Sequence, residues 1–468
     1  MQRQLPKNHD YGVNTCLGCL EKECEIDRLK EENQRLKAAL RYRQRKQEDA
    51  PFGSSTPSSQ IVLKANSKPE DQAKPGGARL GHAGHGRQAT SPQQADCIKA
   101  VTLAAPCPHC GGDLLSKGSR QRTVIDIDAV ELQAILYRLE RKLCLGCGRT
   151  LQAQPPGVLA KSALGNQLLV ELLDGHYLQG IPLGRLCANF GLNIGTVIDA
   201  LHRLAALLQP AIKALISEYR FAAVRHADET RWRTDGQSGY CWLFATTRVS
   251  LYLFRRTRSA SVVKEVLGEK PLEGVLVVDR YAAYNRAPCA LQYCYAHLLR
   301  EVEDLAKENP QEMEVQTFTA ALIPLLAQAQ HLRAQAIGDR QYYKQARQIK
   351  EKIIATSQQA APHLGLRRIQ DIFIDRPQRL YHWVEDRRVP AENNLSEREL
   401  RPTVIARKVS FGSQSDAGAK SRETLMSVLH SLRKRVEQPK KRLKEVLDRI
   451  AHGEVEDVFK MLFANDSS

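Results

Sequence analysis

The sequence predicts a multidomain protein of mixed α/β class, and three features of the 468-residue chain lead to that prediction. Strand-like runs and a helical run alternate between residues 221 and 279, as expected for an α/β core. Two Cys-x-x-Cys pairs between residues 107 and 147 predict a small metal-stabilised module. A heptad pattern within residues 1–50 predicts a helix that packs against another helix. At about 150 residues per domain, the length corresponds to roughly three domains.

The chain is strongly basic, which points to a polyanionic partner such as nucleic acid or an anionic membrane surface. It carries 69 Lys and Arg against 52 Asp and Glu, a formal net charge of +17. Its hydrophobic content of 42% is that of an ordinary globular protein. No apolar run approaches the ~18 residues of a membrane-spanning helix, and the first residues lack the apolar stretch of a signal peptide. We therefore expect a cytoplasmic protein with reduced cysteines.

Residues 1–50 are expected to hold a helix that forms a coiled coil. The heptad seam has apolar residues at its d positions and a single asparagine at an a position, which favours a defined register and a dimer. The residues of this seam are Ile26, Leu29, Asn33, Leu36 and Leu40. A solvated, highly charged helix is the alternative, because the seam spans fewer than three full heptads. Residues 51–100 follow as a flexible linker, since Gly, Pro and Ser fill 17 of these 50 positions.

Residues 101–155 are predicted to form a zinc-binding module. Two C-x-x-C pairs each have a glycine directly after the second cysteine, which permits the positive φ of a zinc knuckle. The four cysteines are Cys107, Cys110, Cys144 and Cys147. Four thiolates would close a tetrahedral site and leave no open position, so the zinc would be structural rather than catalytic. A hairpin from the strand-like runs 123–128 and 133–137 would fill the gap between the pairs; unrelated core cysteines are the alternative.

Residues 156–220 are expected to be helical, and residues 183–201 have the pattern of a helix-turn-helix. Gly191 would form the turn, and Ala188 is small where two helices would cross. Core positions would be filled by Leu192, Val197 and Leu201. A plain helical hairpin explains this pattern about as well as a DNA-reading one.

The catalytic core is predicted within residues 221–412. Three strands, a helix and a buried fourth strand are expected at 221–230, 240–247, 251–254, 259–268 and 274–279. Three meandering strands followed by a helix and another strand match the ribonuclease H-like order, in which the first and fourth strands are neighbours. A helical stretch is expected at about residues 300–390, and residues 413–468 would form a C-terminal helical region.

Three carboxylates are the candidate catalytic residues of this core. Asp228 and Asp279 each follow apolar, strand-like residues, so adjacent strands could deliver both to one sheet edge. Glu397 lies on one helix face with Asn393, four residues earlier. Three carboxylates around a phosphate suit Mg²⁺, and two such ions can assist an in-line displacement. Considered singly, each acid could equally be a turn former, a cap or, for Glu397, a partner of Arg401.

Several ordered motifs resemble the insertion-sequence-66 family of bacterial transposases, a DDE group. They are C-P-H-C-G-G with C-x-x-C-G, H-A-D-E-T-R-W at 226–232, D-R-Y-A-A-Y-N at 279–285, C-Y-A-H-L-L-R at 294–300 and N-N-L-S-E-R-E-L-R-P at 393–402. The resemblance covers roughly residues 100–450, and it implies that the helical stretch at about residues 300–390 is an insertion into the ribonuclease H-like core. Glu392 stands where the family usually has Asp, and Arg280 where Gly is common, but neither replaces a carboxylate of the triad.

The resemblance implies DNA cleavage and strand transfer, with Asp228, Asp279 and Glu397 binding catalytic Mg²⁺ or Mn²⁺. Terminal inverted repeats and target DNA would be the partners, which would place the protein at the nucleoid. A homo-oligomer, a dimer through the N-terminal coil, is expected, and accessory proteins of the same element are a further candidate partner. A catalytically silent, transposase-derived DNA-binding protein and a nuclease without strand transfer are the alternatives.

Basic residues follow the third carboxylate closely. Residues 401–450 hold 13 Lys and Arg and 5 Asp and Glu, a net charge of +8. Arg401, Arg407 and Lys408 could hold phosphates and position the scissile strand without reading its sequence. A solvated helix face is the alternative. Cys294 and His297, three residues apart, could form a metal pair, but the resemblance favours a structural or DNA-positioning motif.

Overall fold

The computed structural model describes residues 22, 25–26, 28–30, 32–33, 93, 132–143, 150–359, 361, 363–454 and 457–463. The chain divides into two units, residues 1–131 and residues 132–468. In the first unit, the described residues between 22 and 33 are helical, and Ile26 and Leu29 are exposed. Leu36, Leu40, the linker and the four cysteines of the predicted zinc module lie outside the described residues. The coiled coil and the zinc module therefore stay predictions.

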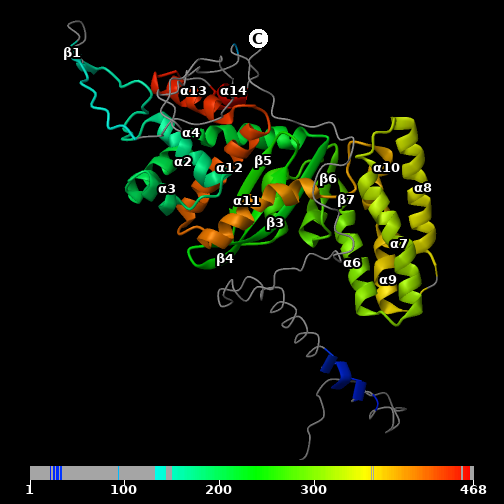
Figure 1. Ribbon diagram of the computed structural model, residues 1–468. Coiled ribbons are helices and arrows are strands. Elements are labelled where there is room, and N and C mark those ends of the chain that lie inside the picture. Colours follow the sequence, from blue (N-terminus) through cyan, green and yellow to red (C-terminus); the bar gives the residue numbers. More distant parts are fainter. Residues whose placement is uncertain are drawn as a thin grey trace, which may run out of the picture. The chain divides into compact units, whose positions relative to one another are not determined.

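A five-stranded mixed sheet forms the centre of the second unit (Figure 1). Its strands lie in the order β5-β4-β3-β6-β7. Their bounds are β3 (Val224–Thr234), β4 (Gln237–Ala245), β5 (Ser250–Arg255), β6 (Val275–Val278) and β7 (Ala290–Tyr293). β3, β4 and β5 form an antiparallel meander, whereas β6 runs parallel to β3 and β7 parallel to β6. The predicted strands, and the predicted neighbourhood of the first and fourth, are confirmed.

Helices from both ends of the unit pack around this sheet. α4 (Ile194–Phe221) leads into β3, and α5 (Ala260–Leu267) joins β5 to β6. α11 (Asn394–Ser410) packs against β3 and β4, and α12 (Asp416–Arg433) packs against β5 and α4. The remaining helices outside the insertion include α2 (Asn166–Leu173), α3 (Leu183–Asn189), α13 (Pro439–Ala451) and α14 (Val458–Phe463).

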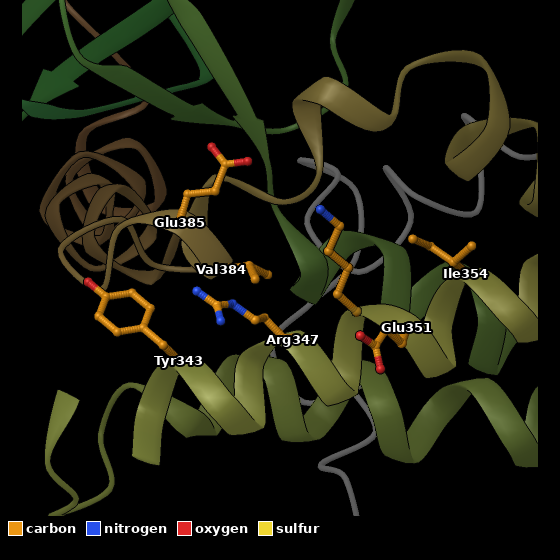
Figure 2. A pocket seen from close by; sticks show the side chains of 7 residues that line it. Tyr343, Arg347, Glu351, Ile354, Val384 and Glu385 are labelled. Atoms are coloured by element: carbon orange, nitrogen blue, oxygen red, sulfur yellow. The ribbon is translucent and has the colours of Figure 1, made fainter. Parts of the chain in front are cut away.

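The helices between β7 and α11 form a separate group beside the sheet (Figure 1). They are α6 (Tyr295–Glu308), α7 (Met313–Leu332), α8 (Asp339–Ser357), α9 (Leu364–Asp375) and α10 (His382–Glu385). The predicted helical stretch near residues 300–390 is confirmed. A cavity of about 550 Å³ opens between α8 and α10, and Figure 2 shows Tyr343 and Arg347 of α8 facing Val384 and Glu385 of α10. None of the predicted site residues lines this cavity.

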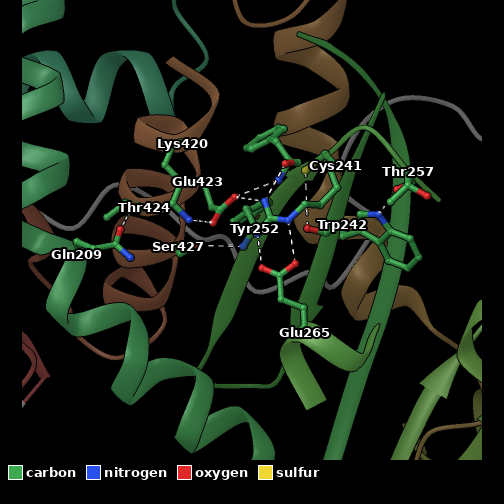
Figure 3. A network of polar contacts seen from close by, with 12 residues as sticks. Gln209, Cys241, Trp242, Tyr252, Thr257, Glu265, Lys420, Glu423, Thr424 and Ser427 are labelled. Atoms are coloured by element: carbon green, nitrogen blue, oxygen red, sulfur yellow. Dashed lines mark hydrogen bonds and ion pairs between the residues drawn. The ribbon is translucent and has the colours of Figure 1, made fainter. Parts of the chain in front are cut away.

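The outer edge of the sheet, at β5, is bonded by side chains of α12. The backbone N–H groups of Ser250, Tyr252 and Phe254 donate to Ser431 Oγ at 3.0 Å, Ser427 Oγ at 2.9 Å and Glu423 Oε2 at 3.2 Å. Figure 3 shows this helix lying along the strand. The match arises because four residues of an α-helix rise about 6 Å, close to the ~6.6 Å of two strand residues. The outward N–H groups of β5 belong to every second residue. Each of them therefore meets an α12 residue that lies four positions before the previous acceptor.

The second half of β3 also has a covered edge. Its ladder with β6 ends where His226 pairs with Val277. Beyond that point, Arg407 of α11 donates from Nη1 to Arg231 O at 2.7 Å, and Ser413 N donates to Arg233 O at 2.9 Å. These bonds fix α11 and the residues after it alongside the part of β3 that follows Asp228.

Two sequence predictions outside the sheet need correction. Residues 132–140 show no regular structure, and the strand pair found instead joins β1 (Arg141–Leu143) to β2 (Thr150–Gln152). An apolar run becomes a strand only where a neighbouring strand accepts its hydrogen bonds, so the run at 133–137 was insufficient evidence. In the predicted helix-turn-helix, Gly191 has a φ of +59° and Val197 and Leu201 are buried as expected. Ala188 is exposed, however, so it is not a helix-crossing residue.

Candidate active site

Asp228 and Asp279 lie just beyond the last paired residues of two parallel strands, β3 and β6. The β3–β6 ladder pairs His226 with Val277. Continued two residues beyond this last pair, the same register would set Asp228 opposite Asp279, the first residue after β6, and the effect of the Asp279 charge on the pKa of Asp228 agrees with this placement. Neighbouring strands are about 4.8 Å apart, and laterally aligned residues of parallel strands point to the same face. The carboxylates predicted from the sequence are therefore brought together at one edge of the sheet.

Glu397 lies in the first turn of α11, and a buried asparagine fixes that turn to β3. Asn393 is fully buried at the N-cap position. Its Nδ2 donates to Ala227 O at 2.9 Å, and its Oδ1 lies 2.8 Å from His226 Nδ1. Glu397 N in turn donates to Asn393 O at 3.3 Å. The turn that carries Glu397 is thus bonded to the residue directly before Asp228.

The electrostatics of Asp228 reflect this gathering of acids. Its pKa is raised well above its usual value, first by burial and then by the charges of Glu229, Asp279 and Glu397. The backbone N–H of Glu229, which donates to Asp228 Oδ1 at 2.8 Å, acts in the opposite direction. No basic side chain is among the causes of this shift in pKa. The carboxylates therefore repel one another, and Arg258, which is paired with Glu229 and is also acted on by the charge of Asp279, offsets only part of this negative charge.

Glu229 is a buried acid of the site that the sequence reasoning missed. Its side chain is only 1% exposed, and it forms an ion pair with Arg258, at 2.7 Å to Nε, and a hydrogen bond with the Tyr284 hydroxyl. Burial raises the pKa of Glu229, as does the charge of Asp279, whereas the Tyr284 hydrogen bond lowers it. The Arg258 guanidinium also stacks 3.8 Å from the centre of the Tyr281 ring. The acid was visible in the H-A-D-E-T-R-W motif, but its partners are distant in sequence.

A metal centre of three protein ligands is not preformed in the part of the chain that the structure describes. Within it, no three His, Cys, Asp or Glu side chains converge closely enough to hold a metal ion. The chemistry of the carboxylates nevertheless fits a hard divalent cation, because Asp228, Asp279 and Glu397 offer oxygen ligands and charges that repel one another. Mg²⁺ or Mn²⁺ would add positive charge beyond that of Arg258.

The three predicted basic residues of α11 differ in their exposure. Arg401 and Lys408 are exposed on α11, whereas Arg407 is half-buried and holds β3. Burial lowers the pKa of Arg407, and the nearby charge of Arg231 lowers it further.

His297 lies in the first turn of α6, and its Nδ1 is buried without a hydrogen-bond partner among the described residues.

Cys294, which precedes α6, connects this helix to the site. Its Sγ accepts the backbone N–H of Asn393 at 3.2 Å, and burial raises the pKa of the thiol to about 11. A neutral, buried thiol that accepts from the α11 N-cap has a structural role. The C-Y-A-H segment therefore contributes to the placement of the turn that carries Glu397.

Comparison with known proteins assigns the chain to a family. The sequence model described as "Transposase IS66 family" matches residues 161–421, more than half of the chain. The chain belongs to this family of transposases, and its general class is that of a DNA-processing enzyme. No helix among the described residues has the length and apolar character needed to cross a membrane.

Three relatives from Sinorhizobium fredii (strain NBRC 101917 / NGR234) are similar over most of the chain. The uncharacterized protein y4jD is 25% identical over 74% of this chain and 75% of its own length. The uncharacterized protein y4qI is 24% identical over 87% of this chain and 80% of its own length. The uncharacterized protein y4hP is 23% identical over 76% of this chain and 72% of its own length. Their names state no activity.

Proposed function

We propose that this protein is a DNA transposase that cuts the ends of its element and joins them to target DNA through a DDE triad. Asp228, Asp279 and Glu397 would form that triad. The observation that carries the proposal is the register that sets Asp228 opposite Asp279, together with the effect of the Glu397 charge on the pKa of Asp228. Membership of a transposase family supports the DNA substrate.

The sheet topology supports a ribonuclease H-like core for this enzyme. An antiparallel meander of three strands is extended by two strands parallel to the first, in the order β5-β4-β3-β6-β7. In this arrangement the first acid is on the central strand and the second follows its parallel neighbour. The helical group between β7 and α11 would be an insertion that returns the chain to the sheet before the third acid.

The residues of the chain have separate tasks in the proposed reaction. Bound Mg²⁺ would activate the attacking oxygen and stabilise the leaving oxygen in an in-line displacement. Asp228 and Asp279 would hold the cation, and their mutual repulsion would be relieved by it. Asn393 would hold the turn that carries Glu397 against β3. Arg401 and Lys408 would contact phosphates near the scissile strand.

The zinc module and the N-terminal coil complete the proposal. Four thiolates at Cys107, Cys110, Cys144 and Cys147 would fold the module around one structural zinc. The module and the helical segment after it would bind terminal DNA, and the coil would pair two chains. Cytoplasmic location at the nucleoid follows from a DNA substrate.

A catalytically silent DNA-binding protein is the second candidate. It is favoured by the absence of a preformed three-ligand metal centre within the described residues. Such a protein would keep the basic surface and the sheet but would not cut DNA with any divalent metal.

Cleavage of the DNA that flanks the gene for this chain tests the proposal. We expect Mg²⁺-dependent nicking at the element ends by the wild type, and loss of nicking in Asp279→Asn. Asp371→Asn, which changes an exposed aspartate of α9, is the matched control and should cut normally. Equal cleavage by Asp279→Asn and the wild type would refute the triad. Binding without cleavage by the wild type in Mg²⁺ and Mn²⁺ would favour the silent protein, and cleavage without joining of pre-cut ends would indicate a nuclease.

A further inference from the structure

The exposed side of α11 combines positive charge with apolar side chains. We call it the α11 face and define it by Arg398, Arg401, Ile405, Lys408 and Val409, which are all exposed. Their spacing of three and four residues places them on one side of the helix. The face begins next to Glu397 and carries no acid further along. Glu399, the other acid of this helix, is turned inward and accepts from Ser250 Oγ at 2.8 Å.

Two cations of this face are not hydrogen-bonded within the described part of the chain. Neither Arg398 nor Arg401 forms a hydrogen bond or an ion pair with another described residue, and Arg398 acts on Glu392 only through its charge. Guanidinium groups that are not hydrogen-bonded to a carboxylate are available to phosphates, which arginine binds with two parallel hydrogen bonds. The charge of the face is therefore complementary to a nucleic-acid backbone that approaches the carboxylates.

An exposed aromatic residue in a strained conformation ends the α11 face. Phe411 follows α11 with a φ of +60°, in the left-handed region where glycine is the usual residue. A bulky side chain is rarely found in this region. Burial of the ring does not compensate the backbone strain, since Phe411 is 67% exposed. Strain of this kind at an exposed residue is a reason to look for a function.

The residues after Phe411 hold the ring in place. A Cβ on Gly412 would lie 2.2 Å from Arg233 O, so this position accepts no side chain. Ser413 donates its N–H to Arg233 O at 2.9 Å and accepts from Asp235 N at 2.9 Å and from Trp232 Nε1 at 3.2 Å. The backbone on the C-terminal side of Phe411 is thus bonded to the end of β3. The ring projects from a fixed support rather than from a loose loop.

The geometry points to a track for one DNA strand, and we propose that Phe411 stacks on an unpaired base of that strand. This inference rests on the proposed function and names a contact of the same substrate. The distance along α11 from Glu397 to Phe411 is about 21 Å at ~1.5 Å per residue. For a strand that keeps the base-stacked rise of ~3.4 Å per nucleotide, this span corresponds to about six nucleotides from the cut. Arg398, Arg401 and Lys408 would contact the phosphates between these points, and aromatic stacking on a base requires no particular sequence.

Substitution of Phe411 by glycine separates a DNA contact from a structural role. Phe411→Gly removes the ring but relieves the positive φ, so the folded protein should be at least as stable as the wild type. If the ring serves DNA, the same variant should bind DNA about tenfold more weakly, the size expected for loss of one stacked base. Replacement of a residue that only supports the fold is not expected to weaken DNA binding while stability is kept or increased.

The experiment uses full-length protein in an Asp279→Asn background, so that binding is measured without cleavage. The probes are duplexes from the flanking DNA with a single-stranded tail that carries 2-aminopurine at successive positions. We expect quenching near the sixth nucleotide with Phe411 or Phe411→Trp, and none with Phe411→Gly. Phe221→Ala, which removes an exposed aromatic ring at the end of α4, is the matched control and should quench normally.

The outcomes distinguish this inference from the proposed function. Equal affinity and equal quenching by Phe411→Gly and its parent would overturn the stacking contact alone. A change in oligomeric state with unchanged DNA binding would also overturn it, and would assign the ring to a contact between chains. Absence of DNA binding by the wild type would refute both. If quenching depends on Phe411 but the Asp279→Asn variant still cuts DNA, the stacking contact is supported and the triad is refuted.

Discussion

Asn393 and His226 form a buried hydrogen bond of 2.8 Å that joins the start of α11 to β3, two residues before Asp228. The donor can be assigned, because Asn393 Nδ2 already donates to Ala227 O and its Oδ1 must accept. His226 is therefore protonated at Nδ1. Burial lowers its pKa to about 4, so the ring is neutral near pH 7.

Removal of this link should both destabilise the protein and impair cleavage. Asn393→Ala leaves His226 Nδ1 and Ala227 O without partners in a buried site, which costs about 1–3 kcal/mol for each unsatisfied group. Chemical denaturation should show a loss of about 2–6 kcal/mol for the two groups together, and nicking should fall because the turn with Glu397 is released. Asn394→Ala, at the exposed neighbouring position, is the stability control. Wild-type stability and activity for Asn393→Ala would contradict this role.

The roles of Asp228 and Asn393 show how far the sequence alone can lead. Apolar residues before Asp228 and Asp279 were enough to predict two strands and their common edge, because strand order follows from the meander and the crossover helix. The anchor between Asn393 and β3 was not predictable, since it joins residues 167 positions apart. The same is true of Glu229, whose partner Arg258 is brought close only by the fold. Local pattern predicts elements, whereas side-chain pairing depends on packing.

Stability should fall as the pH is lowered from neutral toward 5. The pKa of His176 is lowered to about 4, first by burial and then by the charge of Arg422, whose Nη2 lies 2.7 Å from His176 Nε2. A histidine with a depressed pKa in the folded state contributes stability above its unfolded pKa of about 6.5, and this contribution is lost on acidification toward the folded value. Between pH 6.5 and 5 the loss amounts to about 2 kcal/mol.

The pH dependence of His176→Gln tests this origin. Glutamine offers an oxygen to the Arg422 guanidinium but does not titrate, so the variant should lose less stability than the wild type between pH 7 and 5. His226 and His430, whose pKa values are also lowered to about 4 by burial, would account for the dependence that remains. Asp228 acts in the opposite sense, because its raised pKa favours the folded state on acidification. Identical pH profiles for His176→Gln and the wild type would exclude His176 as a contributor.

The hydroxyl of Ser427 should matter although the residue lies in a helix far along the sequence from β5. Ser427→Ala leaves the buried N–H of Tyr252 without its acceptor, which costs about 1–3 kcal/mol. Ser261→Ala, at an exposed position of α5, should change the free energy of unfolding by less than about 0.5 kcal/mol. Urea denaturation of the two variants makes the comparison. A loss for Ser427→Ala no larger than that of the control would mean that the β5 edge finds another acceptor.

Zinc content gives the last prediction, and it concerns a module whose cysteines are shared between the two units, with Cys107 and Cys110 in the first and Cys144 and Cys147 in the second. Purified protein should carry about one zinc per chain, because two C-x-x-C pairs supply one closed tetrahedral site. Cys107→Ser should lose that zinc, since a site with three thiolates and a hydroxyl binds zinc far less tightly. Cys97→Ser, outside both pairs, should keep it. Because the sheet and its carboxylates lie within residues 224–410, outside the predicted module, the zinc-free variant should retain the thermal transition of the sheet while binding terminal DNA more weakly. Unchanged zinc in Cys107→Ser would refute the four-thiolate site.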